Sequence, residues 1–280
     1  WLIYGSWHSG IAALQVNPED GKPLNALGNP WDITGEDNSG YGKIIATRGS
    51  SRWQASEGPE VIYRDGYYYL FLAYGSLSVE YNTRVCRSRN IDGPYVDIHG
   101  NSAMGSAQLY PILTAPYRFD NSYGWVGISH CGIFDDGAGN WFYTSQGRFP
   151  VNVGGNEYSN AIMIGHVRSI RWDANGWPLV MPERYGAVPQ APITENEIAG
   201  DWEHLALTNS TGTQRTSETM TYDLDTHKIT SGSWKNATWT FDAATQTITT
   251  SAGVVLYLQR EVDWEASPRT HTIVLSLIHI

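Results

Sequence analysis

Glu57 is the residue of this chain best placed for acid–base chemistry. It stands in Ser56-Glu-Gly-Pro-Glu60, directly before Val61-Ile-Tyr63, which has the composition of a strand. Pro59 cannot donate to a central ladder, so the strand begins after it, and Gly58 lets a ligand approach closely. Hydrolysis of a glycosidic bond needs a carboxylic acid in such a position to protonate the leaving oxygen. A lone Glu in a loop is structural or solvated in most proteins, and that alternative stays open.

The same chemistry needs a second carboxylate, which acts as base or nucleophile on the other side of the sugar. Glu60 is too close in sequence to Glu57 to be that partner. Asp65 and Asp136 precede glycines in Asp-Gly turns, and we interpret both as structural. The residues by themselves therefore supply a candidate acid and no good candidate for the base.

His130 is the second candidate for chemistry. It lies in Val126-Gly-Ile-Ser-His-Cys131, just before a predicted strand. A lone His near the start of a strand is more often a hydrogen-bonded core residue than a metal ligand. The seven other histidines show no metal-ligand spacing.

A repeat of 70 residues indicates which elements position these side chains. Trp1-Leu-Ile-Tyr-Gly-Ser6 recurs as Phe71-Leu-Ala-Tyr-Gly-Ser76 and, more loosely, as Trp141-Phe-Tyr-Thr-Ser-Gln146. Each copy has strand-like segments and Asp-Gly turns around it. A fixed period of this kind predicts an all-β fold with the blades of a β-propeller, whose innermost strands surround a central channel. Glu57 and His130 then occupy the same position in successive blades.

Composition and charge exclude several classes of function. The net charge of −10 argues against nucleic acid or an anionic membrane as a partner and suits a neutral substrate. No apolar run is long enough to span a bilayer. The 12 Trp and 17 Tyr fit either packing between sheets or stacking on sugar faces. Cys86 and Cys131 are expected to be small buried residues rather than a disulfide framework.

The residue composition and the polar–apolar pattern of the chain change after the repeats, which predicts two domains. Residues 1–186 are expected to form a partial propeller, and the Pro-containing residues 187–198 a linker. Residues 199–280 alternate polar and apolar positions in short Thr-rich strands, which predicts a small antiparallel barrel or sandwich. Fewer blades are countable than a closed ring needs, and the chain ends on apolar residues, so we expect a chain truncated at both ends.

Several motifs together resemble glycoside hydrolase family 43, and most closely its two-domain extracellular endo-1,5-α-L-arabinanases. The resemblance spans residues 1 to about 186 for the propeller and Gly200 to Leu277 for the small barrel that follows. It rests on the motifs Glu57-Gly-Pro-Glu60, Tyr74-Gly-Ser76, Tyr81-Asn-Thr-Arg-Val85, Arg87-Ser-Arg-Asn-Ile-Asp-Gly-Pro-Tyr-Val96 and Ser129-His-Cys131. It implies a five-bladed propeller, of which the N-terminal blades are missing here.

The resemblance implies roles for individual residues. Glu57 matches the general acid, whereas the general-base Asp and a second, pKa-tuning Asp have no match in this chain. Ser6 resembles a substrate-contacting Ser, and Trp7 is expected to form the floor of a sugar subsite or to pack under a loop. Tyr81 and Arg84 are expected to line the cleft, although an Arg on a strand is usually a surface group.

The family resemblance also implies that His130 binds a calcium ion on the propeller axis, with water as most of the other ligands. Calcium prefers oxygen donors, so chemistry alone would not suggest this site.

The expected function is inverting endo-hydrolysis of α-1,5-linked arabinan by a secreted or periplasmic, monomeric enzyme, whose signal peptide is not in this chain. Its substrates would be plant cell-wall arabinan or arabino-oligosaccharides. Without the base, the 280-residue chain itself is expected to be inactive or nearly so. Two alternatives stay open: an exo-acting arabinofuranosidase or xylosidase on the same fold, and a non-catalytic carbohydrate-binding propeller.

Overall fold

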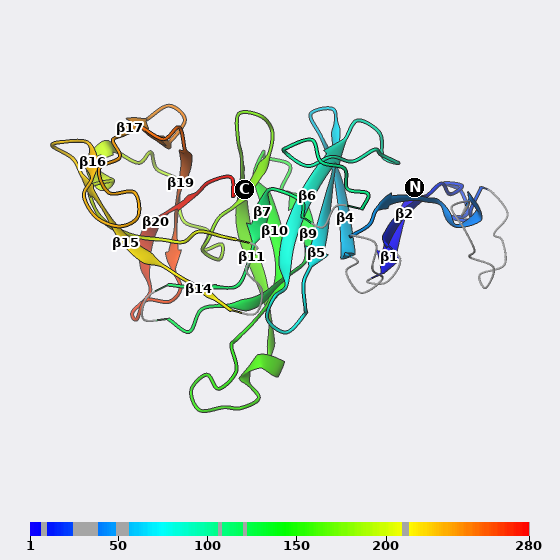
Figure 1. The fold of residues 1–280 in the computed structure, drawn as a ribbon, viewed down its shortest axis with the longest axis horizontal. Helices are drawn as coiled ribbons and strands as arrows, with labels where there is room; N and C mark the ends of the chain where they lie inside the picture. The colour runs from blue at the N-terminus through cyan, green and yellow to red at the C-terminus, as the bar shows by residue number, and fades with distance from the viewer. Residues whose placement is uncertain are drawn as a thin grey trace.

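The computed structural model describes residues 1–6, 10–24, 39–48, 56–105, 108–119, 122–208 and 213–279. The described part is almost entirely β-structure, as predicted (Figure 1). Its helices are three short 3-10 turns: η1 (Ser39–Tyr41), η3 (Ser159–Ala161) and η4 (Glu195–Glu197). Within these residues, no helix has both the length and the apolar character needed to cross a membrane.

Three antiparallel sheets form the N-terminal part of the molecule and lie side by side across its centre and right in Figure 1. The first contains β1 (Leu2–Ser6), β2 (Gly10–Leu14) and β3 (Lys43–Ala46) in that order. The second contains β4 (Glu57–Arg64), β5 (Tyr67–Tyr74), β6 (Asn82–Ser88) and β7 (Ile112–Thr114). The third contains β9 (Val126–Asp135), β10 (Trp141–Arg148), β11 (Met163–Trp172) and β12 (Pro178–Val180).

The 70-residue repeat corresponds to equivalent strands of these sheets. Its copies are β1, β5 and β10, and the last two are each the second strand of a four-stranded sheet. β4 and β9 precede them, and β4 packs against both β9 and β1. The first strands of neighbouring sheets therefore face each other, as blade strands do around an axis.

Asp-Gly pairs make the tight connections, as the sequence predicts. Asp65 and Gly66 connect β4 to β5, between the last paired residues of the ladder, Arg64 and Tyr67. Their φ values are 49° and 82°. Two successive residues at positive φ are what a two-residue hairpin needs to match strand twist. Asp136 accepts backbone hydrogen bonds from Ala138 (2.8 Å) and Asn140 (3.1 Å) in the β9–β10 loop. Asp65 and Asp136 therefore have structural roles.

Apolar and aromatic side chains fill the spaces between the sheets. The cluster between the first and second sheets includes Ile11, Leu70, Leu72 and Cys86. The cluster between the second and third sheets includes Tyr69, Phe71, Val85, Cys131 and Tyr143. Both cysteines are buried and free, which confirms their prediction as packing residues.

The C-terminal part is a separate β-structure with its own core, at the left in Figure 1. One sheet contains β13 (Gly200–His204), β15 (Glu218–Asp223) and β16 (Lys228–Ile229). The other contains β17 (Trp239–Asp242), β18 (Thr247–Thr250), β19 (Val255–Asp263) and β20 (Thr270–Ser276). Tyr222, Trp239, Ile248 and Leu258 form the centre of its apolar cluster.

The stretch predicted as a linker, residues 187–198, packs closely on the C-terminal part. Ile193 and Ile198 are buried in the C-terminal cluster. Arg260 of β19 donates hydrogen bonds to the carbonyls of Ala191 (2.8 Å) and Pro192 (3.1 Å). Apolar side chains among the prolines thus attach this segment to the second domain, so it does not act as a free tether.

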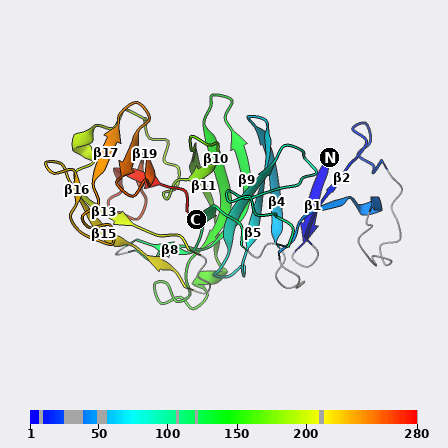
Figure 2. The ribbon, with the colours of Figure 1, turned by 45° about the horizontal axis from the view of Figure 1, so that its top comes forward.

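Direct contacts join the two domains (Figure 2). The short strand β8 (Tyr117–Arg118) of the N-terminal part pairs in parallel with β14 (Arg215–Thr216) of the C-terminal part. Glu261 of β19 is fully buried and accepts hydrogen bonds from Ser169 Oγ (3.2 Å) and Gly186 N (2.8 Å). The domains are therefore docked through specific polar contacts.

Candidate functional site

Glu57 is the first residue of β4 and lies next to an irregularity of the ladder. It pairs with Ala73 of β5, and the register shifts before Glu60 pairs with Phe71. Gly58 occupies this bulge at φ +57°, a left-handed conformation that a side chain would strain. A bulge bends its strand and turns nearby side chains to a new direction, and bulges are frequent beside active sites. Glu57 itself is half-buried.

His130 occupies a comparable irregularity in β9, the first strand of the next sheet. The register between β9 and β10 shifts between Ser129 and Gly132, and His130 has φ +58°. The residue is exposed, and its ring lies over the backbone of Gly58. A Cβ atom at Gly58 would come within 3.1 Å of His130 Cγ and Cδ2. A side chain at position 58 would therefore crowd the His130 ring and would also strain the backbone at this φ angle.

Tyr81 connects the two residues. Its hydroxyl donates a hydrogen bond to Glu57 Oε1 and lies 3.1 Å from His130 Nδ1. Burial and the adjacent Glu57 carboxylate raise the pKa of Tyr81, so its hydroxyl stays protonated. A phenol has one proton to donate. With that proton directed at Glu57, the Tyr81 oxygen is left to accept from His130 Nδ1, and Nε2 is the ring nitrogen that Tyr81 does not contact.

A buried network of hydroxyl groups lies next to Glu57, Tyr81 and His130. Thr83 Oγ1 lies 2.8 Å from Ser129 Oγ and 2.7 Å from the hydroxyl of Tyr143. Ser129 Oγ also lies 3.1 Å from the carbonyl of Asn82, next to Tyr81. Because fully satisfied buried networks are rigid, these contacts hold β6 and β9 in fixed register. Sequence reasoning missed this network; its only signal is hydroxyl residues at inward positions of predicted strands.

Arg84 does not take part in this site. Successive side chains of a strand point to opposite faces, and Thr83 points to β9, so Arg84 points away from it. Its side chain is 2% exposed and donates to Asn82 Oδ1 (2.6 Å) and the Leu109 carbonyl (2.8 Å). This placement contradicts the expected cleft position, because packing between the first two sheets covers the guanidinium.

The structure describes the remaining predicted site residues only in part. Trp7 lies outside the described residues. Ser6 ends β1, where its backbone pairs with Gly10, and its side chain lies outside the described part. Glu60, rejected as the second carboxylate, accepts a hydrogen bond from Ile133 N (3.4 Å) and lies between β4 and β9. Burial raises the pKa of Glu60.

The donor set around His130 is compatible with a single protein ligand to a metal ion. Nε2 is the ring nitrogen left for coordination, and the Nδ1–H bond to Tyr81 fixes the tautomer, as partners of metal-binding histidines commonly do. Among the described residues, no group of three metal-ligating side chains includes His130.

Comparisons with known proteins agree with this architecture. Residues 1–178 match the family model of glycosyl hydrolases family 43, and residues 182–279 match that of a C-terminal lipocalin-like domain. The "Extracellular endo-alpha-(1->5)-L-arabinanase 2" of Bacillus subtilis is 30% identical over 225 residues, 72% of this chain and 43% of the relative. The "Extracellular endo-alpha-(1->5)-L-arabinanase" of Thermotoga petrophila is 30% identical over 224 residues, 73% and 43% of the two chains.

A solved structure extends the similarity to both domains. The endo-1,5-alpha-L-arabinanase from Thermotoga petrophila RKU-1, in complex with TRIS, superposes with a TM-score of 0.79 at 25% identity. The match covers 99% of this chain and 61% of that structure. The fold is thus that of a family 43 propeller with a C-terminal β-domain. The chain spans less than half the length of the curated relatives it matches.

Proposed function

Because this chain belongs to glycosyl hydrolase family 43, we propose that it is the acid-donating part of an inverting endo-1,5-α-L-arabinanase. The observation that carries the proposal is that Tyr81 connects Glu57 and His130, which lie at bulges in the first strands of neighbouring sheets. The substrate class comes from the relatives, which are named endo-arabinanases. Since they are also named extracellular, we infer that this protein acts outside the cell.

In the proposed reaction Glu57 protonates the glycosidic oxygen as the bond to the anomeric carbon breaks. The departing arabinan end leaves as an alcohol, and Glu57 becomes a carboxylate. Tyr81 then donates its hydrogen bond to a charged acceptor, and such bonds are roughly twice as strong as neutral ones. Water attacks the opposite face of the sugar with the help of a base, for which this chain offers no assigned residue.

The activity test uses the full-length protein and linear 1,5-arabinan. Endo action should release a mixture of oligosaccharides from the earliest time points, and the first product should carry the inverted anomeric configuration by NMR. Release of one short product throughout the reaction would identify an exo-acting enzyme instead. Binding to arabinan without any cleavage would show a carbohydrate-binding protein.

Replacement of Tyr81 by Phe should lower kcat on arabinan by roughly 10–100-fold, since a hydrogen bond to a charged group is worth about 1.5–3 kcal/mol. KM should change little, because the bond stabilises Glu57 as it loses its proton and Tyr81 is itself fully buried. Thr240→Val, an exposed hydroxyl loss in the C-terminal domain, is the control. An equal rise in KM with kcat unchanged would make Tyr81 a substrate-binding residue.

We also propose that His130 holds a calcium ion through Nε2. When bound, the ion would supply a fixed positive charge and ordered water near Glu57. Metal analysis after dialysis should find one calcium fewer per chain in His130→Ala than in the unmodified protein. His271→Ala, at an exposed position of the other domain, should keep the full content. Equal calcium in all three proteins would remove His130 from the site.

A further inference from the structure

The connection between β10 and β11, residues 149–162, leaves the propeller at the same edge as Glu57. β10 ends at Arg148, which pairs with Val126, the first residue of β9. Glu57 is the first residue of β4, which packs against β9. The connection therefore begins where the first strands of the two sheets begin, and Figure 1 shows it projecting below the sheets.

Apolar side chains on and beside this connection are open to solvent. Tyr158 is the most exposed of them, at 70%. The others are Val151, Ile162 and Met163. Large apolar side chains that gather in one exposed region commonly mark a binding surface. The connection is therefore a candidate for contact with a ligand.

Hydrogen bonds hold the connection in one conformation. Asn160 Nδ2 donates to the Phe149 carbonyl (2.9 Å) and so ties the end of the connection to its start. Ser159 Oγ donates to the Pro150 carbonyl (2.5 Å) and accepts from Val153 N (3.1 Å). A surface that is already ordered loses little conformational entropy on binding. Tyr158 is thus carried by a preorganised segment.

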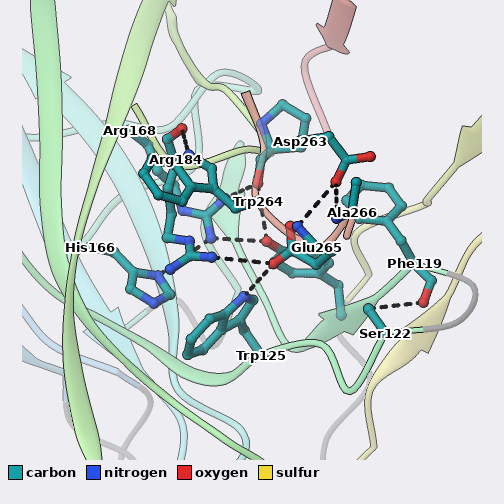
Figure 3. Close-up of polar contacts among 12 residues, drawn as sticks. Phe119, Ser122, Trp125, His166, Arg168, Arg184, Asp263, Trp264, Glu265 and Ala266 are labelled. Carbon is teal, nitrogen blue, oxygen red and sulfur yellow. Dashed lines mark hydrogen bonds and ion pairs between the residues drawn. The ribbon is translucent and has the colours of Figure 1, made fainter. Parts of the chain in front are cut away.

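The C-terminal domain supports the base of the connection. The Phe149 ring stacks on Trp125, with the ring centroids 4.7 Å apart and an interplanar angle of 21°. Trp125 Nε1 donates a hydrogen bond to Glu265 Oε1 (3.1 Å) of the C-terminal domain, as Figure 3 shows. Docking of the second domain therefore fixes the ring on which the connection rests.

A second connection links this segment to Glu57. Asn160 Nδ2 also donates to the carbonyl of Ser78 (2.9 Å), which lies between β5 and β6. Three residues further on, the Tyr81 hydroxyl donates to Glu57. Leu77, directly before Ser78, is exposed. Contacts of the two connections thus lead from the acid to the exposed ring along one edge of the propeller.

We propose that Tyr158 forms a remote arabinan subsite, in which its ring stacks on a sugar away from the bond that Glu57 protonates. This inference rests on the proposed function. An enzyme that cleaves inside a polymer holds the chain on both sides of the bond, so a rigid surface along the same edge extends its grip. The ring offers a flat apolar face, and the exposed Asn152, Asn156 and Glu157 offer polar groups to sugar hydroxyls.

The test measures binding without cleavage, by affinity electrophoresis of the full-length protein carrying Glu57→Gln in gels that contain linear 1,5-arabinan. Adding Tyr158→Ala should raise Kd roughly 3–10-fold, the usual scale of a lost aromatic contact. Adding Tyr158→Phe should leave Kd unchanged, because stacking uses the ring and not the hydroxyl. Tyr63→Ala is the matched control, since Tyr63 is 61% exposed at the opposite end of β4.

Activity gives an independent measurement. With Glu57 intact, Tyr158→Ala should raise KM for arabinan by the same factor and leave kcat unchanged, because the ring does not touch the reacting bond. KM for an aryl arabinofuranoside, which occupies only the cleavage position, should not change.

The outcomes separate the subsite from the activity. Equal arabinan affinity in the Tyr158→Ala and Tyr63→Ala proteins would overturn the subsite, even where the unmodified protein cleaves arabinan. Binding that depends on Tyr158, in a protein that cleaves no arabinan, would support the subsite and refute the hydrolase. A loss in Tyr158→Phe as large as in Tyr158→Ala would overturn stacking, and failure of every protein to bind arabinan would overturn both proposals.

Discussion

Replacement of Glu57 by Gln should lower arabinan hydrolysis by the full-length protein about 10²–10⁴-fold, the usual contribution of a general acid. Glutamine keeps the size of the side chain and can still accept the Tyr81 hydrogen bond, so the site should stay intact. It cannot release a proton to the leaving oxygen. The loss should appear in kcat, because the proton is transferred in the transition state.

The clearest test of this prediction compares two substrates whose leaving groups differ in their need for protonation. An aryl glycoside with an acidic phenol departs without much protonation, so Glu57→Gln should keep far more activity on it than on arabinan. Glu60→Gln is the matched control, three residues along β4, since its amide oxygen can still accept from Ile133 N. Equal losses on both substrates would exclude Glu57 as the acid, and full activity on arabinan would place the acid at another residue.

Replacement of Glu261 by Ala should lower the free energy of unfolding by about 2–4 kcal/mol, because it leaves buried donors without an acceptor. The carboxylate is 0% exposed and accepts from Gly186 N (2.8 Å) and Ser169 Oγ (3.2 Å) of the N-terminal part. In the docked structure Ser169 is buried and Gly186 is half-buried. Scanning calorimetry should show Tm lowered by roughly 5–15 °C.

Glu195→Ala is the control for this effect. Glu195 pairs with His227 at 3.1 Å where both side chains are 43% exposed, and an exposed pair contributes at most about 1 kcal/mol. A loss of stability at Glu261 no larger than that at Glu195 would show that the docked interface does not depend on this carboxylate. A new early transition in the Glu261 variant would instead report separation of the domains before either unfolds.

The sequence alone determined the backbone plan of this protein. The 70-residue repeat identified β1, β5 and β10 as equivalent strands, because strand period and Asp-Gly turns are local properties. It also placed Glu57 and His130 at comparable positions of neighbouring sheets, and both lie at bulges of first strands. Tyr81 was expected near them, but the sequence did not indicate that its hydroxyl contacts both.

Tertiary structure alone decided which side chains meet. Tyr81 and Arg84 belong to one motif and both are buried, yet Tyr81 contacts Glu57 whereas Arg84 contacts Asn82 and the Leu109 carbonyl. The Pro-containing segment is attached to the C-terminal domain by Ile193 and Ile198, which no local signal distinguishes from a free linker. Glu183 and Glu265 approach each other because the domains dock, and long-range docking depends on complementary surfaces that local sequence does not encode.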